Sequence, residues 1–212
     1  LHSRDLNKSG PSLDIQRAFP PAVPPREFAA LARAGGVILD TRGAAEFCAC
    51  HPAGALQVGL DGQYASWVGT LLRPDQDLLL VVDPARAEEA VTRLARVGYE
   101  RVVGILDGGC ERWRAEGLPV ESVAEVPAES LGSGTHHVLD VRRKPEWESS
   151  HLGGATHMPL AQLADRAREL DRNAEWTVMC ASGYRSTIGA SVLRRAGFGR
   201  VRTAAAVERV TR

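Results

Sequence analysis

The stretch WTVMCASGYRS, residues 176–186, joins a short apolar run to a polar turn, and residues 187–196 after it have the pattern of a helix. The apolar run predicts a buried strand. Cys180 comes directly after this run, so its thiol lies on a tight turn before a helix N-terminus. Backbone N–H groups and the helix dipole favour a thiolate there, and Arg185 adds a fixed positive charge. The stretch therefore predicts a reactive Cys180.

The simplest alternative for Cys180 is structural, because a lone cysteine at the end of a strand often packs as a small buried hydrophobe. The residues that follow it argue against this interpretation. Ser182, Gly183, Arg185 and Ser186 would line a hydrophobic core poorly, whereas hydroxyls, a glycine turn and a guanidinium suit a loop that binds an anion. The pattern favours a nucleophilic cysteine.

The pattern C-x-S-G-x-R-S over residues 180–186 resembles the active-site loop of the rhodanese family of sulfurtransferases, in which the cysteine carries a persulfide. A second match lies upstream. The runs VLDVR (138–142), EW (146–147), HLGGA (151–155) and MPL (158–160) resemble the strand-and-loop signature of that family. Because the two matches are independent and occur in the right order, the resemblance implies a rhodanese domain in this part of the chain.

The upstream signature occurs twice, which predicts two copies of one domain. The run LDTR at 39–42 recurs as LDVR at 139–142, and HPAGA at 51–55 recurs as HLGGA at 151–155. Both pairs are separated by 100 residues. Two copies are therefore expected to follow each other head to tail.

The expected boundaries follow from the ends of the repeats. We expect a first domain at residues 26–121 and a second at 122–212, with the proline-flanked segment 119–127 as connector. Residues 1–25 are proline-rich and begin without Met, so they are expected to be a linker or the remnant of a preceding domain. The second copy ends without the Gly-Gly and Trp motif that the first contains at 107–113.

Each copy alternates short apolar runs with amphipathic segments. The runs VIL (37–39) and LLLVV (78–82) suit strands buried on both faces, and residues 86–97 have an apolar helical face. This alternation predicts an α/β fold with a mostly parallel sheet flanked by helices in each copy, and the resemblance implies two tandem rhodanese-like domains. In such folds ligands bind beyond the carboxyl ends of the strands, where Cys180 falls.

The first copy lacks the nucleophile. Its run VVD (81–83) aligns with VMC (178–180), so Asp83 is expected in the place of the thiol, on a loop two residues shorter and without glycine. This copy resembles the inactive rhodanese domains that accompany active ones, and we expect it to serve as a packing partner. The alternative, a catalytic role for Asp83, lacks a recognisable neighbouring histidine or carboxylate.

Composition limits the classes of function. The 26 basic and 26 acidic residues cancel, so no polyanion such as nucleic acid is an expected partner. No apolar run approaches the roughly 18 residues of a membrane span, and the N-terminus does not resemble a signal peptide, so we expect no membrane association and a cytoplasmic location. Four cysteines are too few for a disulfide scaffold, and CACH (48–51) lacks a second pair of zinc ligands. We expect neither a metal nor a cofactor.

The resemblance implies covalent sulfur transfer, with Cys180 and Arg185 as the catalytic residues. The Cys180 thiolate would take sulfur from a small sulfur-containing anion such as thiosulfate, or from a low-molecular-weight persulfide, and pass it to a thiol or cyanide. The Cys-x4-Arg spacing is one residue shorter than in related phosphatases, which argues against a phosphate ester. The residues expected to bind the substrate are Ala181, Ser182, Gly183, Tyr184, Ser186 and Arg142, although a structural pair between Arg142 and Glu146 is the favoured role for Arg142.

A further resemblance concerns the first copy, where YASWVG (64–69) looks like tandem rhodanese modules that follow a metallo-β-lactamase-fold persulfide dioxygenase domain. It implies a fused or partner domain of that kind, and hence an alternative function as a non-catalytic persulfide carrier or docking module. The intact loop at Cys180 favours an enzyme. Because Cys48, Cys50 and Cys110 lack a Gly-Arg loop, we expect Cys180 to be the one redox-active thiol.

Overall fold

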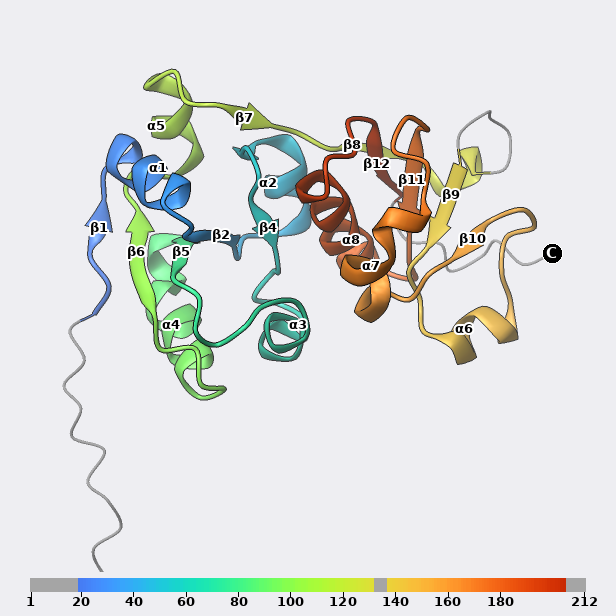
Figure 1. Cartoon of the computed structure of the whole chain (residues 1–212), viewed down its shortest axis with the longest axis horizontal. Helices are drawn as coiled ribbons and strands as arrows, with labels where there is room; N and C mark the ends of the chain where they lie inside the picture. The colour runs from blue at the N-terminus through green and yellow to red at the C-terminus, as the bar shows by residue number, and fades with distance from the viewer. Residues whose placement is uncertain (1–18, 132–136, 205–212) are drawn as a thin grey trace, which may run out of the picture.

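The computed structural model describes residues 19–131 and 137–204, which form two α/β units (Figure 1). Each unit is built on a five-stranded sheet in which all neighbouring strands are parallel. The first sheet has the order β1-β6-β5-β2-β4, with bounds Ala22–Val23, Val102–Leu106, Leu78–Val81, Val37–Asp40 and Leu56–Gln57. The second has the order β8-β12-β11-β9-β10, with bounds Ala124–Val126, Val201–Ala204, Trp176–Met179, His137–Asp140 and Thr156–His157. The matching strand orders confirm the predicted repeat and fold class.

Helices flank both sheets. In the first unit they are α1 (Pro25–Arg33), α2 (Ala44–Ala49), α3 (Tyr64–Leu71), the 3-10 helix η1 (Pro84–Arg86), α4 (Ala87–Ala95) and α5 (Gly109–Ala115). The second unit contains the 3-10 helix η2 (Ala128–Ser130), α6 (Lys144–Ser149), α7 (Leu160–Arg166), the 3-10 helix η3 (Ala167–Glu169) and α8 (Tyr184–Arg195). Within the described part of the chain, no helix is long and apolar enough to cross a membrane.

The first sheet begins before the boundary expected at residue 26. Strand β1 pairs with β6, and the N–H of Ile105 donates to the carbonyl of Pro21 at 2.9 Å. Prolines are compatible with this edge strand because its outer side needs no N–H donors. The segment expected as connector, 119–127, is also structured. It contains β7 (Val120–Glu121), which pairs antiparallel with β3 (His51–Pro52), and then β8 of the second sheet.

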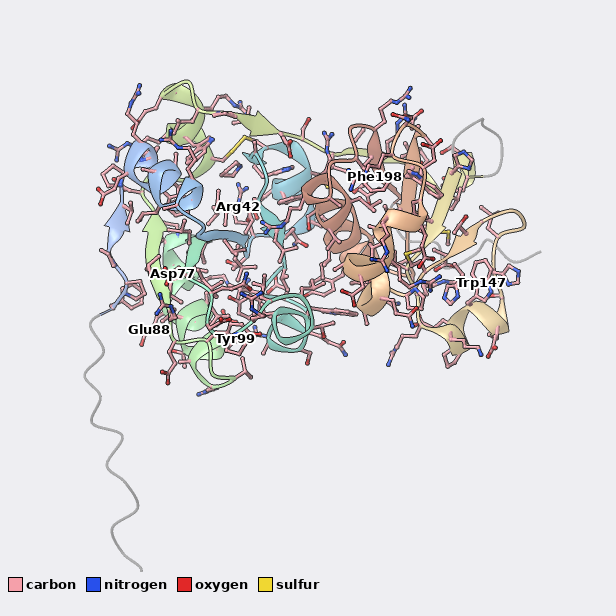
Figure 2. All side chains as sticks on the ribbon, viewed as in Figure 1. Arg42, Asp77, Glu88, Tyr99, Trp147 and Phe198 are labelled. Atoms are coloured by element: carbon pink, nitrogen blue, oxygen red, sulfur yellow. A yellow bond between two sulfur atoms is a disulfide. The ribbon has the colours of Figure 1, made fainter. Side chains whose placement is uncertain are left out.

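A disulfide that the cysteine count did not predict joins Cys50 to Cys110 (Figure 2). Cys50 directly follows α2, and Cys110 lies in the first turn of α5. The bond therefore connects two helices of the first unit that are far apart in sequence. Cys48 and Cys180 are free and buried.

Helix α8 lies between the two sheets (Figure 1). It contacts β11 and β12 of its own unit and β4 at the edge of the first sheet. All eight residues from Ser186 to Leu193 are buried, and several of them are small, which lets both sheets approach the helix closely. A single cluster of buried apolar side chains, from Leu39 in the first unit to Leu139 in the second, continues through this contact. The two units thus share one core.

Polar contacts fix how α8 meets the first sheet. The backbone N–H of Gln57, on the edge strand β4, donates to the Ser191 hydroxyl at 3.0 Å. Near the end of the helix, the Arg195 guanidinium donates to the carbonyl of Gly54 at 2.8 Å. One backbone N–H of the edge strand therefore has its partner in the second unit, and α8 packs along this edge.

Candidate active site

Strand register identifies the residue of the first copy that corresponds to Cys180. The last residues of the central strands pair as Asp40 with Val81 in the first sheet and as Asp140 with Met179 in the second. The next residue is Val82 in one copy and Cys180 in the other. The expectation that Asp83 takes the place of the thiol is therefore wrong by one residue, because a run of apolar residues does not fix its own register and only the pairing with Asp40 does. A buried valine occupies that place.

Asp83 instead has a local structural role. Its side chain accepts the N–H of Ala85 at 2.9 Å and caps η1. The side chain is exposed. The first copy thus presents neither a thiol nor a carboxylate at the position of Cys180.

Cys180 begins the loop that joins β11 to α8. Gly183, with φ of +86°, precedes the first residue of α8, and this left-handed conformation favours glycine. The backbone N–H of Ser186, in the first turn of α8, donates to Cys180 Sγ at 3.3 Å. This N–H is directed at the sulfur from the positive end of a helix of 12 residues, a place that suits an anionic group.

The Ser186 hydroxyl belongs to a buried network beneath this loop. It donates to the carbonyl of Gly183 at 2.9 Å and accepts from the Thr203 hydroxyl at 2.9 Å. Cys180 Sγ lies 3.6 Å from the same oxygen. Ser186, expected to bind substrate, is therefore placed to hold the loop and the sulfur in position.

The Cys180 side chain has no exposed surface in this conformation. A donor in solution therefore has no direct path to Sγ. Of the loop that follows, Ser182 is exposed and Ala181 and Gly183 are half-buried. The loop residues, and not the sulfur, meet the solvent.

Arg185 forms an ion pair with Glu146 that the sequence did not predict. Its two terminal nitrogens donate to the two carboxylate oxygens, each at 2.7 Å. These bonds lower the pKa of Glu146 to about 2, although partial burial opposes the shift. The Arg185 charge near Cys180 is consequently shared with a carboxylate, and its side chain is only 16% exposed.

Arg142 pairs with Asp140, which corrects the expected pair with Glu146. Its guanidinium donates to both carboxylate oxygens, with the shortest contact at 2.7 Å, and also to the carbonyl of Ser150 at 2.7 Å. Arg42 makes the same bonds to Asp40 and to the carbonyl of Cys50 in the first copy. Because the copy without a nucleophile has the same arrangement, the arginine serves the fold of each copy. Arg142 is buried, so it does not face a substrate.

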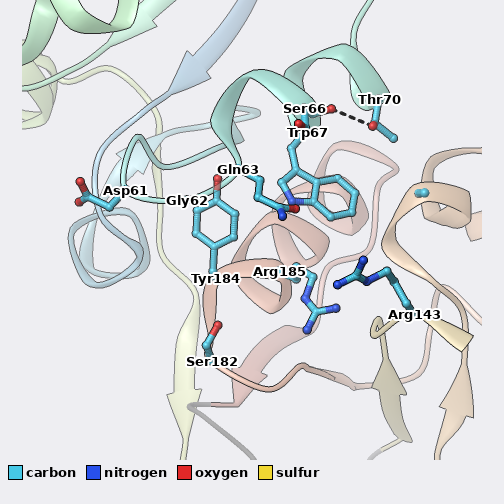
Figure 3. Close-up of a pocket in the computed structure, with 11 residues that line it drawn as sticks. Asp61, Gly62, Gln63, Ser66, Trp67, Thr70, Arg143, Ser182, Tyr184 and Arg185 are labelled. Atoms are coloured by element: carbon cyan, nitrogen blue, oxygen red, sulfur yellow. Dashed lines mark hydrogen bonds between the residues drawn. The ribbon is translucent and has the colours of Figure 1, made fainter. Parts of the chain in front are cut away.

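A cavity of about 550 Å³ lies beside the loop, between the two copies (Figure 3). Helix α3 and the residues before it form the first-copy wall. The opposite wall comes from the second copy and includes Ser182, Tyr184 and Arg185 of the loop together with Arg143. Cys180, Ala181, Gly183, Ser186 and Arg142 are not among the residues that line it. Of the expected site residues, three thus line the cavity, namely Ser182, Tyr184 and Arg185, and the other five do not.

Tyr184 connects the loop to the first copy. Its hydroxyl donates to the carbonyl of Gly59 at 2.9 Å, and burial raises its pKa to about 12, so it stays a donor. A Cβ at Gly62 would overlap the Tyr184 ring. The first copy therefore holds the start of α8 through a contact that only glycine allows.

The sequence missed the residues outside the loop that line the cavity, among them Arg143, Trp67 and Gln63. Arg143 follows the Asp-x-Arg motif directly, and Trp67 lies in a run that was noticed only as a resemblance. No sequence motif marks either position as part of a cavity, because the cavity forms only where the two copies pack against each other. Within residues 19–131 and 137–204, no group of three or more His, Cys, Asp or Glu side chains could hold a metal.

Cys48 is buried and free, like Cys180. Burial is the main cause that raises the pKa of the Cys48 thiol to about 11, so it stays protonated at neutral pH. Cys50 and Cys110 are bonded to each other. The closing segment of the second copy, residues 205–212, lies outside the described residues, as does most of the lead-in 1–25.

The model of the rhodanese-like domain family matches residues 24–116 and again residues 123–205. The chain therefore belongs to the rhodanese-like family, as a tandem of two domains. This match confirms the family predicted from the loop and the repeat.

Individual relatives match shorter parts. The putative sulfur carrier protein YrkF of Bacillus subtilis is 40% identical over 65 residues, which are 31% of this chain and 35% of that protein. The thiosulfate sulfurtransferase GlpE of Pseudomonas fluorescens is 34% identical over 64 residues, 30% of this chain and 59% of that protein. The chain thus spans about a third to three fifths of the length of these relatives. A solved thiosulfate sulfurtransferase from Pseudomonas aeruginosa is 26% identical, with a TM-score of 0.42, covering 88% of this chain and 41% of that one.

The contact between Gly62 and Tyr184 predicts that Gly62→Ala destabilises the protein by about 1–3 kcal/mol, because the added methyl overlaps the ring. The matched control is Gly69→Ala in α3, where a Cβ meets nothing within 4 Å; it is expected to stabilise by about 0.5–1 kcal/mol. Urea unfolding measures both. In a Tyr184→Ala background the cost of Gly62→Ala should largely disappear. An equal cost in both backgrounds would contradict the contact.

The Glu146–Arg185 pair predicts a dependence of stability on pH. Because the folded state lowers the pKa of Glu146 from 4.5 to about 2, its contribution is fully present above about 4.5 and is lost as the pH falls toward 2. The free energy of unfolding of the wild type should exceed that of Glu146→Gln near neutral pH, and the difference should shrink over this window. A difference that does not vary with pH would argue against the ion pair.

Proposed function

We propose that the protein is a sulfurtransferase that moves sulfane sulfur from thiosulfate or a low-molecular-weight persulfide to a thiol or cyanide through a persulfide on Cys180. The observation that carries the proposal is the N–H of Ser186 directed at Cys180 Sγ at the start of α8. The first copy has Val82 at this position. Membership of the rhodanese-like family supports it at the level of the family, as do relatives named as a thiosulfate sulfurtransferase and a putative sulfur carrier.

The first step loads the enzyme. The Cys180 thiolate attacks the outer sulfur of thiosulfate, the sulfur–sulfur bond of the donor breaks, and its electron pair leaves with sulfite. With an organic persulfide as donor, the leaving group is the thiolate. In both cases a persulfide forms on Cys180, and no other oxidant or reductant is needed.

The second step unloads it. A thiolate or cyanide attacks the terminal sulfur, the persulfide bond breaks, and its electron pair returns to Cys180. The product is an organic persulfide or thiocyanate. Backbone N–H groups from Ala181 to Arg185 would stabilise the charge of the terminal sulfur, in the way that amide groups stabilise an oxyanion. Arg185 would bind an anionic donor with the N–H groups that Glu146 leaves free.

Access is part of the mechanism, because Cys180 is fully buried in this conformation. The donor must displace the loop that begins at Ala181. Exposed Ser182 and the glycine at 183 give this loop little to hold it in place on the solvent side. The network through Ser186 lies on the other side and stays intact.

The division of the chain is then functional as well as structural. The copy at 26–121 has no nucleophile and forms one wall of the cavity, whereas the copy at 122–212 carries the sulfur. A cytoplasmic location, and a fused or partner domain of the metallo-β-lactamase fold, stay predictions from the sequence. Disulfides such as Cys50–Cys110 are uncommon in cytosolic proteins. This bond therefore argues against the predicted cytoplasmic location and does not bear on the reaction.

The second candidate is a persulfide carrier that passes its sulfur on without turning over. It is favoured by the complete burial of Cys180 and by the likeness to a putative sulfur carrier protein. The two functions differ in stoichiometry. With thiosulfate and cyanide in excess, an enzyme forms many molecules of thiocyanate per chain, and a carrier at most one.

The direct test is mass spectrometry after brief treatment with thiosulfate. We expect one extra sulfur atom on the peptide that contains Cys180, none in Cys180→Ser, and the wild-type result in Cys48→Ala, because the raised pKa of Cys48 keeps it unreactive. Folding of each variant is checked by circular dichroism. Sulfur found on Cys48, or on no cysteine of the folded wild type, would overturn the proposal.

A further inference from the structure

A second cavity lies where the two copies meet, at the other end of α8 from the Cys180 loop. Its volume is about 460 Å³. The first copy supplies most of its wall, from the end of α1, the start of β2 and the turn before β4, and the second copy supplies Arg195. Because each of the 12 residues of α8 adds about 1.5 Å, about 18 Å of helix separate this cavity from the loop. It is therefore distinct from the site of the proposed reaction.

Two guanidiniums line this cavity, and no carboxylate is found among the described residues of its wall. Arg33 ends α1 and Arg195 ends α8, where positive charges also offset the helix dipoles. Arg33 Nε donates to the carbonyl of Ala29 at 3.2 Å, and Arg195 Nη1 donates to the carbonyl of Gly54 at 2.8 Å. A guanidinium has five N–H groups. Within residues 19–131 and 137–204, most donors of both side chains thus lack an acceptor.

The neighbourhood of Gln76 explains why these charges stay uncompensated. Gln76 lines the cavity, and its Oε1 accepts the N–H of Arg73 at 2.8 Å, which leaves its amino group as a further donor. The carboxylates on either side of it in the sequence already have cations. Asp75 pairs with Arg73 at 3.1 Å, and Asp77 pairs with Arg101 at 2.6 Å. The cavity therefore presents donors and positive charge without a matching acceptor.

The repeat shows that packing of the copies creates this arrangement. The run LARVG at 94–98 recurs as LRRAG at 193–197, so Arg195 corresponds to Arg96 of the first copy. Arg96 is exposed after the end of α4 and lines neither this cavity nor the one beside the loop. Contact with the first copy partly desolvates the Arg195 guanidinium, which lowers its pKa. A bound anion would offset this loss of solvation.

We propose that this cavity binds a tetrahedral oxyanion such as a phosphate group, held between Arg33 of the first copy and Arg195 of the second. Each guanidinium can form two parallel N–H bonds to such a group, and Gln76 adds an uncharged donor. The volume accommodates a free phosphate ion as well as a small organic phosphate. A bound oxyanion links α1 to the end of α8 and so stabilises the contact between the copies. The proposal does not depend on the reaction at Cys180.

The binding test is isothermal titration calorimetry with inorganic phosphate, at an ionic strength kept constant with chloride. We expect saturable binding to the wild type and about tenfold weaker binding to Arg195→Gln and to Arg33→Gln, through loss of charge-assisted hydrogen bonds. The matched control is Arg96→Gln, which removes the equivalent arginine of the first copy and should bind like the wild type. Equal affinity of Arg195→Gln and Arg96→Gln would overturn the proposal, as would the absence of saturable binding to the wild type.

Further variants guard against loss of the fold. Circular dichroism checks the folding of each protein. If Arg195→Gln does not fold, Arg33→Gln decides the test, because the Arg33 side chain is exposed. Arg195→Lys keeps the charge without the planar fork, and its affinity should lie between those of the wild type and Arg195→Gln. An affinity of Arg195→Lys below that of Arg195→Gln would contradict a charge-based site.

Stability provides a second readout. Phosphate should raise the free energy of unfolding of the wild type in urea more than it raises that of the Arg33→Gln/Arg195→Gln double variant. Phosphate also stabilises proteins without binding, through exclusion from their surface, and this part is common to both. An equal gain in the two proteins would mean that phosphate acts only in this general way and would contradict the site.

Two comparisons identify the source of the oxyanion and the place of binding. Tighter binding of ribose 5-phosphate than of inorganic phosphate would assign the site to organic phosphates, and equal binding would assign it to the free ion; both outcomes support the oxyanion site. Cys180→Ser should bind phosphate like the wild type, because the cavity lies at the other end of α8. Loss of binding in folded Cys180→Ser would place the phosphate at the reactive loop and overturn the proposal.

Discussion

The burial of helix α8 between two sheets is the constraint on which the rest of this structure depends. A helix normally turns one face to the core and one to solvent, but residues 186–193 are buried all round, against β11 and β12 on one side and β4 of the other copy on the opposite side. The loop that begins at Cys180 comes directly before this helix. Its position is therefore set by the core of both copies at once, and not by the second copy alone.

The first copy contributes to the site although it has Val82 at the position of Cys180. Both copies keep the buried Asp-x-Arg pair that holds the chain after the second strand of the sheet, so this motif serves folding. The copies differ after the strand that lies beside this one in the sheet. Val82 follows β5 in the first copy, and Cys180 follows β11 in the second. The first copy then contributes Gly62, which receives Tyr184, and α3, which forms a wall of the cavity. The first copy thus holds Tyr184 in position and encloses the cavity on one side.

Features carried by local spacing could be predicted from the sequence, and features carried by packing could not. The repeat, the α/β class and the family were readable because LDTR and LDVR, like the loop after Cys180, are continuous motifs. The placement of Asp83 failed because a run of apolar residues such as LLLVV slides by one residue without penalty until pairing with Asp40 sets its register. The partner of Arg142 was wrong for a related reason: Asp140 and Glu146 are both near in sequence, and only burial selects Asp140. The roles of Cys180 and Arg185 stay predictions.

Scanning calorimetry of the whole chain tests the central claim most directly, namely that α8 makes one cooperative unit of the two copies. A shared core predicts a single unfolding transition in which the calorimetric enthalpy equals the van 't Hoff enthalpy. Two resolved transitions, or a calorimetric enthalpy about twice the van 't Hoff value, would mean that the copies unfold independently and would contradict the account.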